Sequence, residues 1–413
     1  MASLQGAALI GQSGGPTSAI NAAALGAIEA CLDSPDITRV YGMQYGIRGV
    51  LDDKLYVLDE EDRDELKLLK YTPSSFLGTC RYKLKNPADD DTDYQRILEI
   101  FKKYDIRYFF LIGGNDSMDT CNKVSKFMLD NGYECRVMGI PKTIDNDLYG
   151  TDHCPGYGSA AKYIATTCKE VSLDARVYDI GMITIIEAMG RHAGWLVAAA
   201  ALAGDYAPDL IYLPELEFDM ETFLDDVDAL YKKNGNVIVA VSEGIHDKDG
   251  KFISEYGASG DQTKDSFGHT QLGGLAAILA ARAKERTGAK VRGIELSLLQ
   301  RCASRLASQT DLDESYASGQ AAVEHAVSGV TDKMIGFDVT REGGYTCELV
   351  LLPLDTVANT EKKVPREWIN EAGNKVLPAF VDYALPLIQG ETKQEMQDGL
   401  PRFAKLKRII ANA

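Results

Sequence analysis

The sequence predicts an α/β fold of two doubly wound, mostly parallel-sheet (Rossmann-like) domains, with the active site in the cleft between them. Short apolar runs have the continuous hydrophobic character of strands that are covered on both faces: residues 7–11, 107–112, 135–140, 180–187, 209–213 and 236–242. Between them lie stretches with apolar residues at helical spacing: residues 18–31, 94–104, 117–130, 157–170, 219–232 and 270–286. The chain has 413 residues, too many for one simple core. Strand–helix alternation over this length predicts βαβ units, whose ligands bind beyond the carboxyl ends of the strands.

The composition excludes several classes of function. The net charge of −17 argues against broad binding to nucleic acid or to anionic membranes. No apolar run approaches the ~18 residues of a membrane span, and the start of the sequence lacks the basic region of a signal peptide. The eight cysteines form no CxxC motif and no cluster with histidine. Reduced thiols and a cytoplasmic location are therefore expected.

The first turn of interest is "GQSGGPTSAIN", residues 11–21, where Gly14 and Gly15 follow a strand and precede an alanine-rich helix. Bare backbone N–H groups and the helix dipole suit a phosphate group at such a place. The alternative is a merely tight strand-to-helix turn.

The second turn, "GGNDS", begins with Gly113 and Gly114 after a long apolar strand. It too suits phosphate, yet Asn115 is followed by Asp116, which puts a negative charge where an anion would bind.

The third turn, "PKTIDND", residues 141–147, brings together Lys142, Thr143, Asp145 and Asp147. A lysine can stabilise a phosphoryl group in transfer, and a carboxylate can remove a proton from an attacking hydroxyl. The alternative is a solvated loop with an Asx turn.

A fourth turn, "EAMGRHAGW", residues 187–195, places Arg191 after a strand. Arginine suits bidentate contact with phosphate, although a surface arginine at a helix start is the simpler interpretation of this turn alone. We expect His192 to be structural. Arg81 in "FLGTCR" and Glu243 in "SEG" are two further polar side chains beside glycines.

The pieces "SGGP", "FLGTCR", "GGNDS", "PKTIDND", "EAMGR", "SEG" and "LLQR" occur in the order found in the phosphofructokinase family, which this sequence resembles over residues 13–301. The resemblance implies an enzyme that transfers a phosphoryl group to the C1 hydroxyl of fructose 6-phosphate, giving fructose 1,6-bisphosphate, with Mg²⁺. It implies a donor domain over residues 1–155, a fructose 6-phosphate domain over 156–299, and a C-terminal region over 300–413 that completes both. It also implies a homodimer or homotetramer.

The resemblance gives roles to individual residues. Asp145 would be the general base, and Arg81 and Arg191 would clamp the donor phosphates and the transition state. Residues that would bind the donor are Gly14, Gly15, Arg81, Gly113 and Gly114. Residues that would bind the sugar phosphate are Thr143, Ile144, Asp145, Asp147, Met189, Gly190, Arg191, Glu243, Arg292 and Arg301.

The donor is indicated by two positions. Where ATP-using members have glycine, this sequence has Asp116 and Lys142, the pair that marks members using inorganic diphosphate. Asp116 would exclude ATP by its volume and charge, and Lys142 would stabilise the transition state. Such a reaction is readily reversible and would serve glycolysis and gluconeogenesis.

The sequence departs from the family pattern at three positions. Asn115 stands where an acid usually helps to hold Mg²⁺; its amide oxygen can still coordinate the metal but contributes no charge. Met182 stands where the family has an arginine that reaches in from a neighbouring subunit, and Arg176 is a candidate replacement. Leu298 replaces a histidine near the 6-phosphate.

Three alternatives remain open from the sequence. The first is ATP-dependent or mixed-donor activity, against which positions 116 and 142 argue. The second is a non-catalytic, regulatory homologue that binds sugar phosphate, which Asn115 alone favours. The third is a lipid or NAD kinase, since those also use Gly-Gly-Asp turns, and "PKTIDND" followed by "MGR" argues against it.

Overall fold

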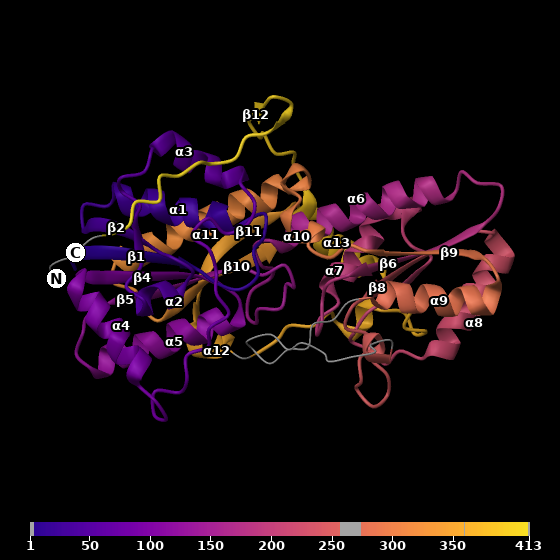
Figure 1. The fold of residues 1–413 in the computed structure, drawn as a ribbon, viewed down its shortest axis with the longest axis horizontal. Coiled ribbons are helices and arrows are strands. Elements are labelled where there is room, and N and C mark those ends of the chain that lie inside the picture. The colour runs from indigo at the N-terminus through magenta and orange to yellow at the C-terminus, as the bar shows by residue number, and fades with distance from the viewer. Residues whose placement is uncertain (1–3, 257–273, 359, 412–413) are drawn as a thin grey trace.

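The structure, a computed structural model, describes residues 4–256, 274–358 and 360–411, which form two lobes, each built on one sheet (Figure 1). The first sheet has the strand order β11-β10-β5-β4-β1-β2-β3 and the second the order β7-β8-β6-β9. The strands of the first are β1 Gly6–Gln12, β2 Ile37–Met43, β3 Leu55–Val57, β4 Ile106–Gly113, β5 Arg136–Pro141, β10 Lys333–Thr340 and β11 Thr346–Pro353. Those of the second are β6 Met182–Ala188, β7 Leu210–Tyr212, β8 Val237–Ser242 and β9 Lys290–Glu295.

The first sheet is doubly wound. Strands β1, β2, β4, β5 and β10 pair in parallel, and the sheet ends in the antiparallel pairs β2–β3 and β10–β11. Side chains alternate between faces along each strand: Leu9 and Phe109 pack on one side with helices α4 (Thr92–Lys103) and α5 (Asn115–Asp130), while Ile10 and Phe110 pack on the other with α1 (Ile20–Asp33) and α11 (Gln309–Val327). All seven residues of β1 are buried, as its continuous apolar sequence predicts.

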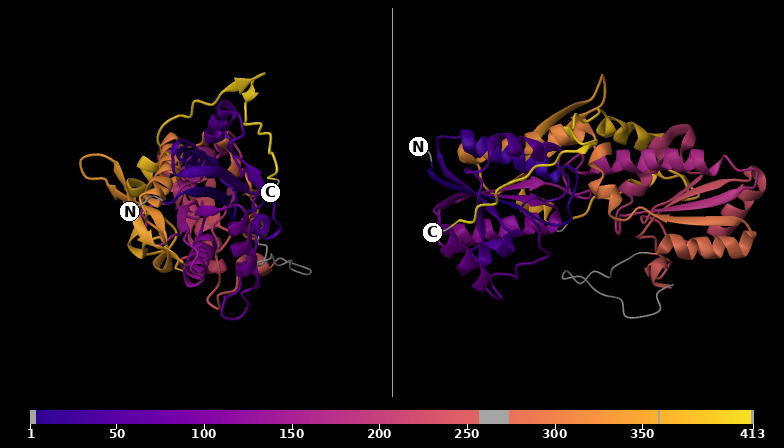
Figure 2. Two further views of the ribbon diagram at one scale, coloured as in Figure 1. Left: turned by 90° about the vertical axis from the view of Figure 1, so that its left-hand side faces the viewer. Right: turned by 45° about the horizontal axis from the view of Figure 1, so that its top comes forward.

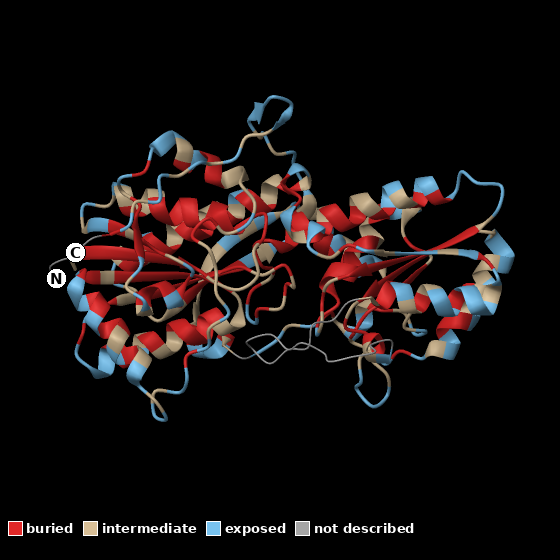
Figure 3. Ribbon diagram, viewed as in Figure 1, coloured by how far each residue is buried: buried red, intermediate tan, exposed pale blue. Residues whose placement is uncertain are grey.

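The second sheet is parallel throughout. One face packs against α6 (Tyr157–Ala175), α7 (Trp195–Ala198) and α13 (Pro378–Ala384), and the other against α8 (Met220–Asn234) and α9 (Leu275–Thr287). Figure 3 shows most strands of both lobes as buried layers between helices with exposed outer faces, whereas the edge strands β9 and β11 are half-buried or exposed. The chain also contains four short helices: α2 (Ile47–Leu51), α3 (Arg63–Lys67), α10 (Leu299–Cys302) and α12 (Leu354–Val357).

The C-terminal part of the chain contacts both lobes. Strands β10 and β11 extend the first sheet, and Phe380 of α13 lies in the core of the second lobe. After a small antiparallel hairpin, β12 (Met396–Gln397) and β13 (Leu400–Pro401), the tail returns along the first lobe (Figures 1 and 2). There Ile410 forms a bridge with Tyr56 of β3.

The predicted fold class is confirmed, and each strand expected from the sequence is present. The helix expected over 270–286 is present from Leu275, and its expected first residues up to 273 lie outside the described residues. The sequence interpretation missed β2, β3, β9, β10 and β11. The domain boundaries stay a prediction.

All eight cysteines are free thiols, and among the described residues no helix is long and apolar enough to cross a membrane.

Candidate active site

A cavity of about 680 Å³ lies where the carboxyl ends of strands from both sheets meet. Turns that follow β1, β4 and β5 line it from the first lobe, and turns that follow β6 and β8 line it from the second. The predicted site residues on its wall are Gly14, Gly15, Arg81, Gly114, Asn115, Asp116, Lys142, Thr143, Asp145, Asp147, Arg191 and Glu243. The structure therefore brings together residues that are up to 229 positions apart in the sequence, from Gly14 to Glu243.

Lys142 connects the first and third turns. Its ammonium donates a hydrogen bond of 2.7 Å to the carbonyl oxygen of Gly15, and the side chain is almost fully buried. Gly14 has a φ of +76°, and a Cβ there would lie 3.2 Å from Lys142 Nζ, so a side chain at this position would crowd the ammonium. Burial lowers the pKa of Lys142 to about 8, against the opposing effect of the nearby Asp145 and Asp147 carboxylates. The lysine thus stays mostly charged at neutral pH beneath the glycine turn.

Asp145 has the electrostatic surroundings of a general base. Burial raises its pKa to about 7, and the neighbouring carboxylates of Asp147 and Glu243 add to this shift. A hydrogen bond of 3.1 Å from the backbone N–H of Asp145 to the Thr143 hydroxyl oxygen fixes the turn. A base with a pKa near the working pH combines the correct protonation state with a strong tendency to accept a proton. Asp145 therefore fits the role that the resemblance implies.

Asn115 and Asp147 form a second pair of polar groups in the cavity. Asn115 Nδ2 donates to Asp147 Oδ2 at 3.2 Å, whereas Asn115 Oδ1 is buried without a hydrogen-bond partner among the described residues. Burial raises the pKa of Asp147. A buried oxygen of this kind can take a water or an ion as its partner. Amide and carboxylate oxygens are ligands that Mg²⁺ accepts, so these two residues fit a magnesium ion.

Asp116 lies in the first turn of α5, and its carboxylate forms an ion pair of 3.2 Å with Lys83 Nζ. Both side chains are about half exposed. The ion pair offsets part of the charge of Asp116. Gly113, which precedes this turn, does not line the cavity. A Cβ on Gly113 would lie 2.0 Å from Ser117 Oγ, so glycine allows the close approach of strand and helix.

In the second lobe, the turn after β6 is held by backbone contacts with neighbouring segments. Gly190 has a φ of +124°, and its N–H points to Glu243 Oε1 at 3.4 Å. The Met189 N–H donates to Gln300 Oε1 at 3.1 Å. Burial raises the pKa of Glu243, although the Gly190 N–H and the Arg191 charge oppose the rise. The backbone of Met189 and Gly190, which we expect to contact the sugar, thus lies beside the part of the cavity wall that Arg191 and Glu243 form.

The structure places the remaining predicted residues differently. Arg301, on α10, lies close to the first turn, because a Cβ on Gly15 would be 3.2 Å from its Nη1. Burial and then the charge of Arg81 lower the pKa of Arg301. Ile144 is buried in the core of the second lobe. Arg292 does not line the cavity: it lies on β9 beside a separate hollow of about 250 Å³, together with Met182.

The sequence interpretation missed Ser13, Ser117, His192 and Glu361 on the cavity wall. The first two belong to turns that were recognised, so their positions could have been inferred. His192, expected to be structural, lines the cavity and also packs edge-on against Phe252. Glu361 comes from the C-terminal region, where Lys362 N–H donates to the carbonyl oxygen of Asp147, and no local pattern marks it.

Comparison with known proteins agrees with this site. Residues 7–295 match the phosphofructokinase family. A pyrophosphate–fructose 6-phosphate 1-phosphotransferase of Halomonas elongata is 42% identical, with 97% of this chain and 96% of the relative covered. A sulfofructose kinase of Alkalicoccus urumqiensis is 31% identical, over 93% of this chain and 97% of the relative. The crystal structure of a pyrophosphate-dependent phosphofructokinase from Marinobacter aquaeolei superimposes with a TM-score of 0.89 at 38% identity, covering 99% of this chain and 98% of that one.

Turns from five strand ends meet in one cavity, a buried carboxyl there has a pKa near neutrality, and the sequence matches relatives along almost its whole length. The chain belongs to the phosphofructokinase family.

Proposed function

We propose that the protein transfers a phosphoryl group from inorganic diphosphate to the C1 hydroxyl of fructose 6-phosphate, giving fructose 1,6-bisphosphate and phosphate. The observation that carries this proposal is the meeting of Asp116, Lys142 and Asp145 on one cavity wall. The names of the relatives with 42% identity point to the same donor and acceptor.

In this proposal Asp145 accepts the proton of the sugar hydroxyl as that oxygen attacks the phosphorus atom. Lys142 and Arg191 balance the charge on the phosphoryl group in transfer, and the glycine turns hold the remaining donor oxygens. Catalysis then consists mostly of positioning and charge stabilisation, with one base.

Mg²⁺ is the proposed metal. Asn115 Oδ1 and the Asp147 carboxylate would hold it, and it would offset the charge of the diphosphate. We expect the metal to arrive mainly on the donor, because Asn115 contributes no charge. Full activity in excess EDTA would contradict this part of the proposal.

Arg292 supports a shared site. Since it lies outside the cavity of its own chain, beside Met182, we propose that it reaches the sugar phosphate of a second copy in a homodimer or homotetramer. We also propose a cytoplasmic role in glycolysis and gluconeogenesis, because transfer from diphosphate is readily reversible and all eight cysteines are free thiols.

Coupled assays with diphosphate and with ATP as donors, side by side, test the donor. We expect turnover with diphosphate and little with ATP. A protein that prefers ATP would overturn the donor assignment, and a protein that binds fructose 6-phosphate without turnover would support the regulatory alternative. Sulfofructose as a second acceptor tests the sugar specificity, since one relative is named for it.

A further inference from the structure

Asn146 lies between Asp145 and Asp147 in the third turn, residues 141–147, which is the catalytic turn. Its side chain points away from the two carboxylates into the protein. The residue is fully buried and has a φ of +55°, a conformation that asparagine tolerates better than most residues. Its Oδ1 accepts a hydrogen bond of 2.9 Å from the backbone N–H of Cys154, and its Nδ2 donates to the Tyr383 hydroxyl at 2.8 Å. The side chain therefore fixes the backbone between Asp145 and Asp147 from two sides.

Tyr383 passes this restraint to another part of the chain. It lies on α13, and its hydroxyl donates to the carbonyl oxygen of Asp152 at 2.7 Å while it accepts from Asn146. A tyrosine hydroxyl has one proton and can also accept, so both bonds can form together. The ring is buried against Trp195 and Trp368, at centroid distances of 5.2 and 5.4 Å. The hydroxyl is thus held at a defined place.

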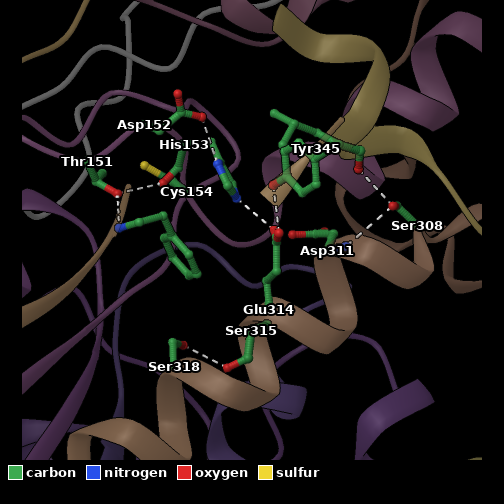
Figure 4. A network of polar contacts seen from close by, with 12 residues as sticks. Thr151, Asp152, His153, Cys154, Ser308, Asp311, Glu314, Ser315, Ser318 and Tyr345 are labelled. Carbon is green, nitrogen blue, oxygen red and sulfur yellow. Dashed lines mark hydrogen bonds and ion pairs between the residues drawn. The ribbon is translucent and has the colours of Figure 1, made fainter. Parts of the chain in front are cut away.

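The Asp152 segment is itself anchored by a buried network (Figure 4). Arg341 donates two bonds of 2.8 Å to the Asp152 carboxylate, and His153 Nδ1 lies 3.0 Å from the same group. His153 Nε2 lies 2.8 Å from Glu314 on α11, and the Tyr345 hydroxyl donates to that glutamate at 2.6 Å. These contacts connect the segment to α11 and to the β10–β11 hairpin.

The hydrogen bonds and charges of this network support one another. Burial alone would lower the pKa of His153, but the carboxylates on either side of the ring raise it overall. The bonds from Arg341 and His153 outweigh the effect of burial and lower the pKa of Asp152. A histidine ring held at both nitrogens by carboxylates, one of which also accepts two bonds from Arg341, gives a rigid support.

We propose that Asn146 and Tyr383 are positioning residues for the phosphoryl transfer: they hold the backbone of the catalytic turn so that Asp145 and Asp147 face the cavity. The proposal rests on the proposed function. Its physical basis is that the carboxylates of Asp145 and Asp147, partly buried and two residues apart, repel one another, so the turn would relax without a restraint. A displacement of the base by about 1 Å can lower the rate about 10²-fold.

Two variants test the proposal. Tyr383→Phe removes one hydroxyl and keeps the ring, whereas Asn146→Gly removes the amide and keeps a residue suited to the left-handed φ. We expect kcat to fall about tenfold or more in each, with KM for fructose 6-phosphate and diphosphate changed less than about threefold. The two effects on log kcat should be less than additive in the double variant, because each single variant already loses the hydrogen bond between Asn146 and Tyr383.

Tyr133→Phe is the matched control. The Tyr133 hydroxyl is also buried and also bonds backbone carbonyls, those of Phe101 and Ile106 at 3.0 Å each, but it lies in the core of the first lobe with no contact to the catalytic turn. We expect a lower Tm with unchanged kcat for this variant.

The outcomes separate the two proposals. A wild-type protein without turnover on any donor contradicts the proposed function. A folded Tyr383→Phe or Asn146→Gly protein with wild-type kcat overturns the positioning role. Variants that are unfolded at the assay temperature would assign the pair to stability alone. Variants with a lowered Tm but an unchanged kcat, like the control, would do the same, and either result would overturn the positioning role.

Discussion

The two groups closest to the proposed chemistry have pKa values displaced toward each other. Burial raises the pKa of Asp145 to about 7 and lowers that of Lys142 to about 8. In water an aspartate and a lysine titrate more than six units apart. The reaction needs an ionised Asp145 and a protonated Lys142. Both forms are abundant together only in the narrow pH range between the two pKa values.

The pH dependence of kcat/KM follows from these two groups. Below about pH 7 Asp145 is protonated and cannot act as a base, so activity should rise as the pH rises through this value. Above about pH 8 Lys142 loses its charge, so activity should fall as the pH rises further. Initial rates at fixed free Mg²⁺ should give a bell-shaped profile.

In Lys142→Arg the residual activity should keep the acid limb and lose the alkaline limb, and an unchanged alkaline limb would remove Lys142 from this assignment.

Asp145→Asn should lose most of kcat while binding of fructose 6-phosphate largely survives. Removal of a general base typically costs about 10²–10⁴ in rate, and asparagine keeps the size of the side chain. Single-turnover kinetics and calorimetric binding of the sugar phosphate measure the two effects separately. A variant with near-wild-type kcat would show that another group takes the proton.

Donor choice should depend on Asp116 and Lys142 in different ways. Asp116→Gly should open the nucleotide path and allow weak use of ATP. Lys142→Gly should lower kcat with diphosphate by about 10²–10³, the usual cost of a lost charge contact in the transition state. The measurement is kcat/KM for both donors in the wild type, the single variants and the double variant.

Asp116→Asn is the control for the charge of Asp116, because it removes the charge and keeps nearly the same side-chain volume. If volume dominates the exclusion of ATP, this variant should still reject ATP. An Asp116→Gly protein without any gain in ATP use would contradict the role of the residue.

Among the larger elements, helices α1 and α11 pack unusually closely. A Cβ on Gly319 would lie 2.0 Å from the carbonyl oxygen of Ala23, and one on Gly26 would lie 2.0 Å from that of Tyr316. Glycine at both positions lets the two backbones touch. Because α1 begins just after the first glycine turn, this packing also holds the donor side of the cavity.

Gly319→Ala should therefore destabilise the protein, by about 1–3 kcal/mol, as overpacking of a close contact usually does. Thermal or urea unfolding measures the change. Glu324→Ala, at an exposed position of the same helix, is the control and should stay within about 0.5 kcal/mol of the wild type. Equal stability of Gly319→Ala and the wild type would mean that the helices separate at no cost.

The sequence predicted the inner strands and most of the cavity because both follow from local patterns. Buried parallel strands are continuously apolar, and their polar turns meet at one edge of the sheet, as Gly14, Asp116 and Lys142 do. Edge strands are covered less completely: β9 is exposed at Arg292 and at Glu295, and no residue of β11 is fully buried. The Lys83–Asp116 ion pair and Glu361 depend on tertiary contacts that no local pattern specifies.

On the scale of the whole molecule, one end of the second lobe carries an exposed apolar surface. Leu173, Val177, Tyr178 and Ile180 lie near the end of α6 and after it, and Val177 and Ile180 are each 71% exposed. Arg292 and Met182 line the hollow nearby, together with Asp174 and Ala175. This surface is the place where we expect the second copy to bind.

Val177→Glu should then lower the oligomer mass in sedimentation velocity and reduce activity at low protein concentration, because it places a charge in an apolar contact. Leu129→Glu is the control, since Leu129 is 78% exposed near the end of α5 in the other lobe. The oligomer assignment fails if the two variants sediment and react alike.

The late addition of β10, β11 and the C-terminal tail has a consequence for biosynthesis. Until residues 333–353 leave the ribosome, β5 is an open edge of the first sheet, and until Ile410 follows, β3 lacks its bridging partner. At ribosomal rates, the roughly 200 residues between β5 and β10 take about 10–40 s to make. Open strand edges pair readily with those of other nascent chains. We therefore expect added chaperones to shield the half-made lobe and to favour the native protein over inclusion bodies.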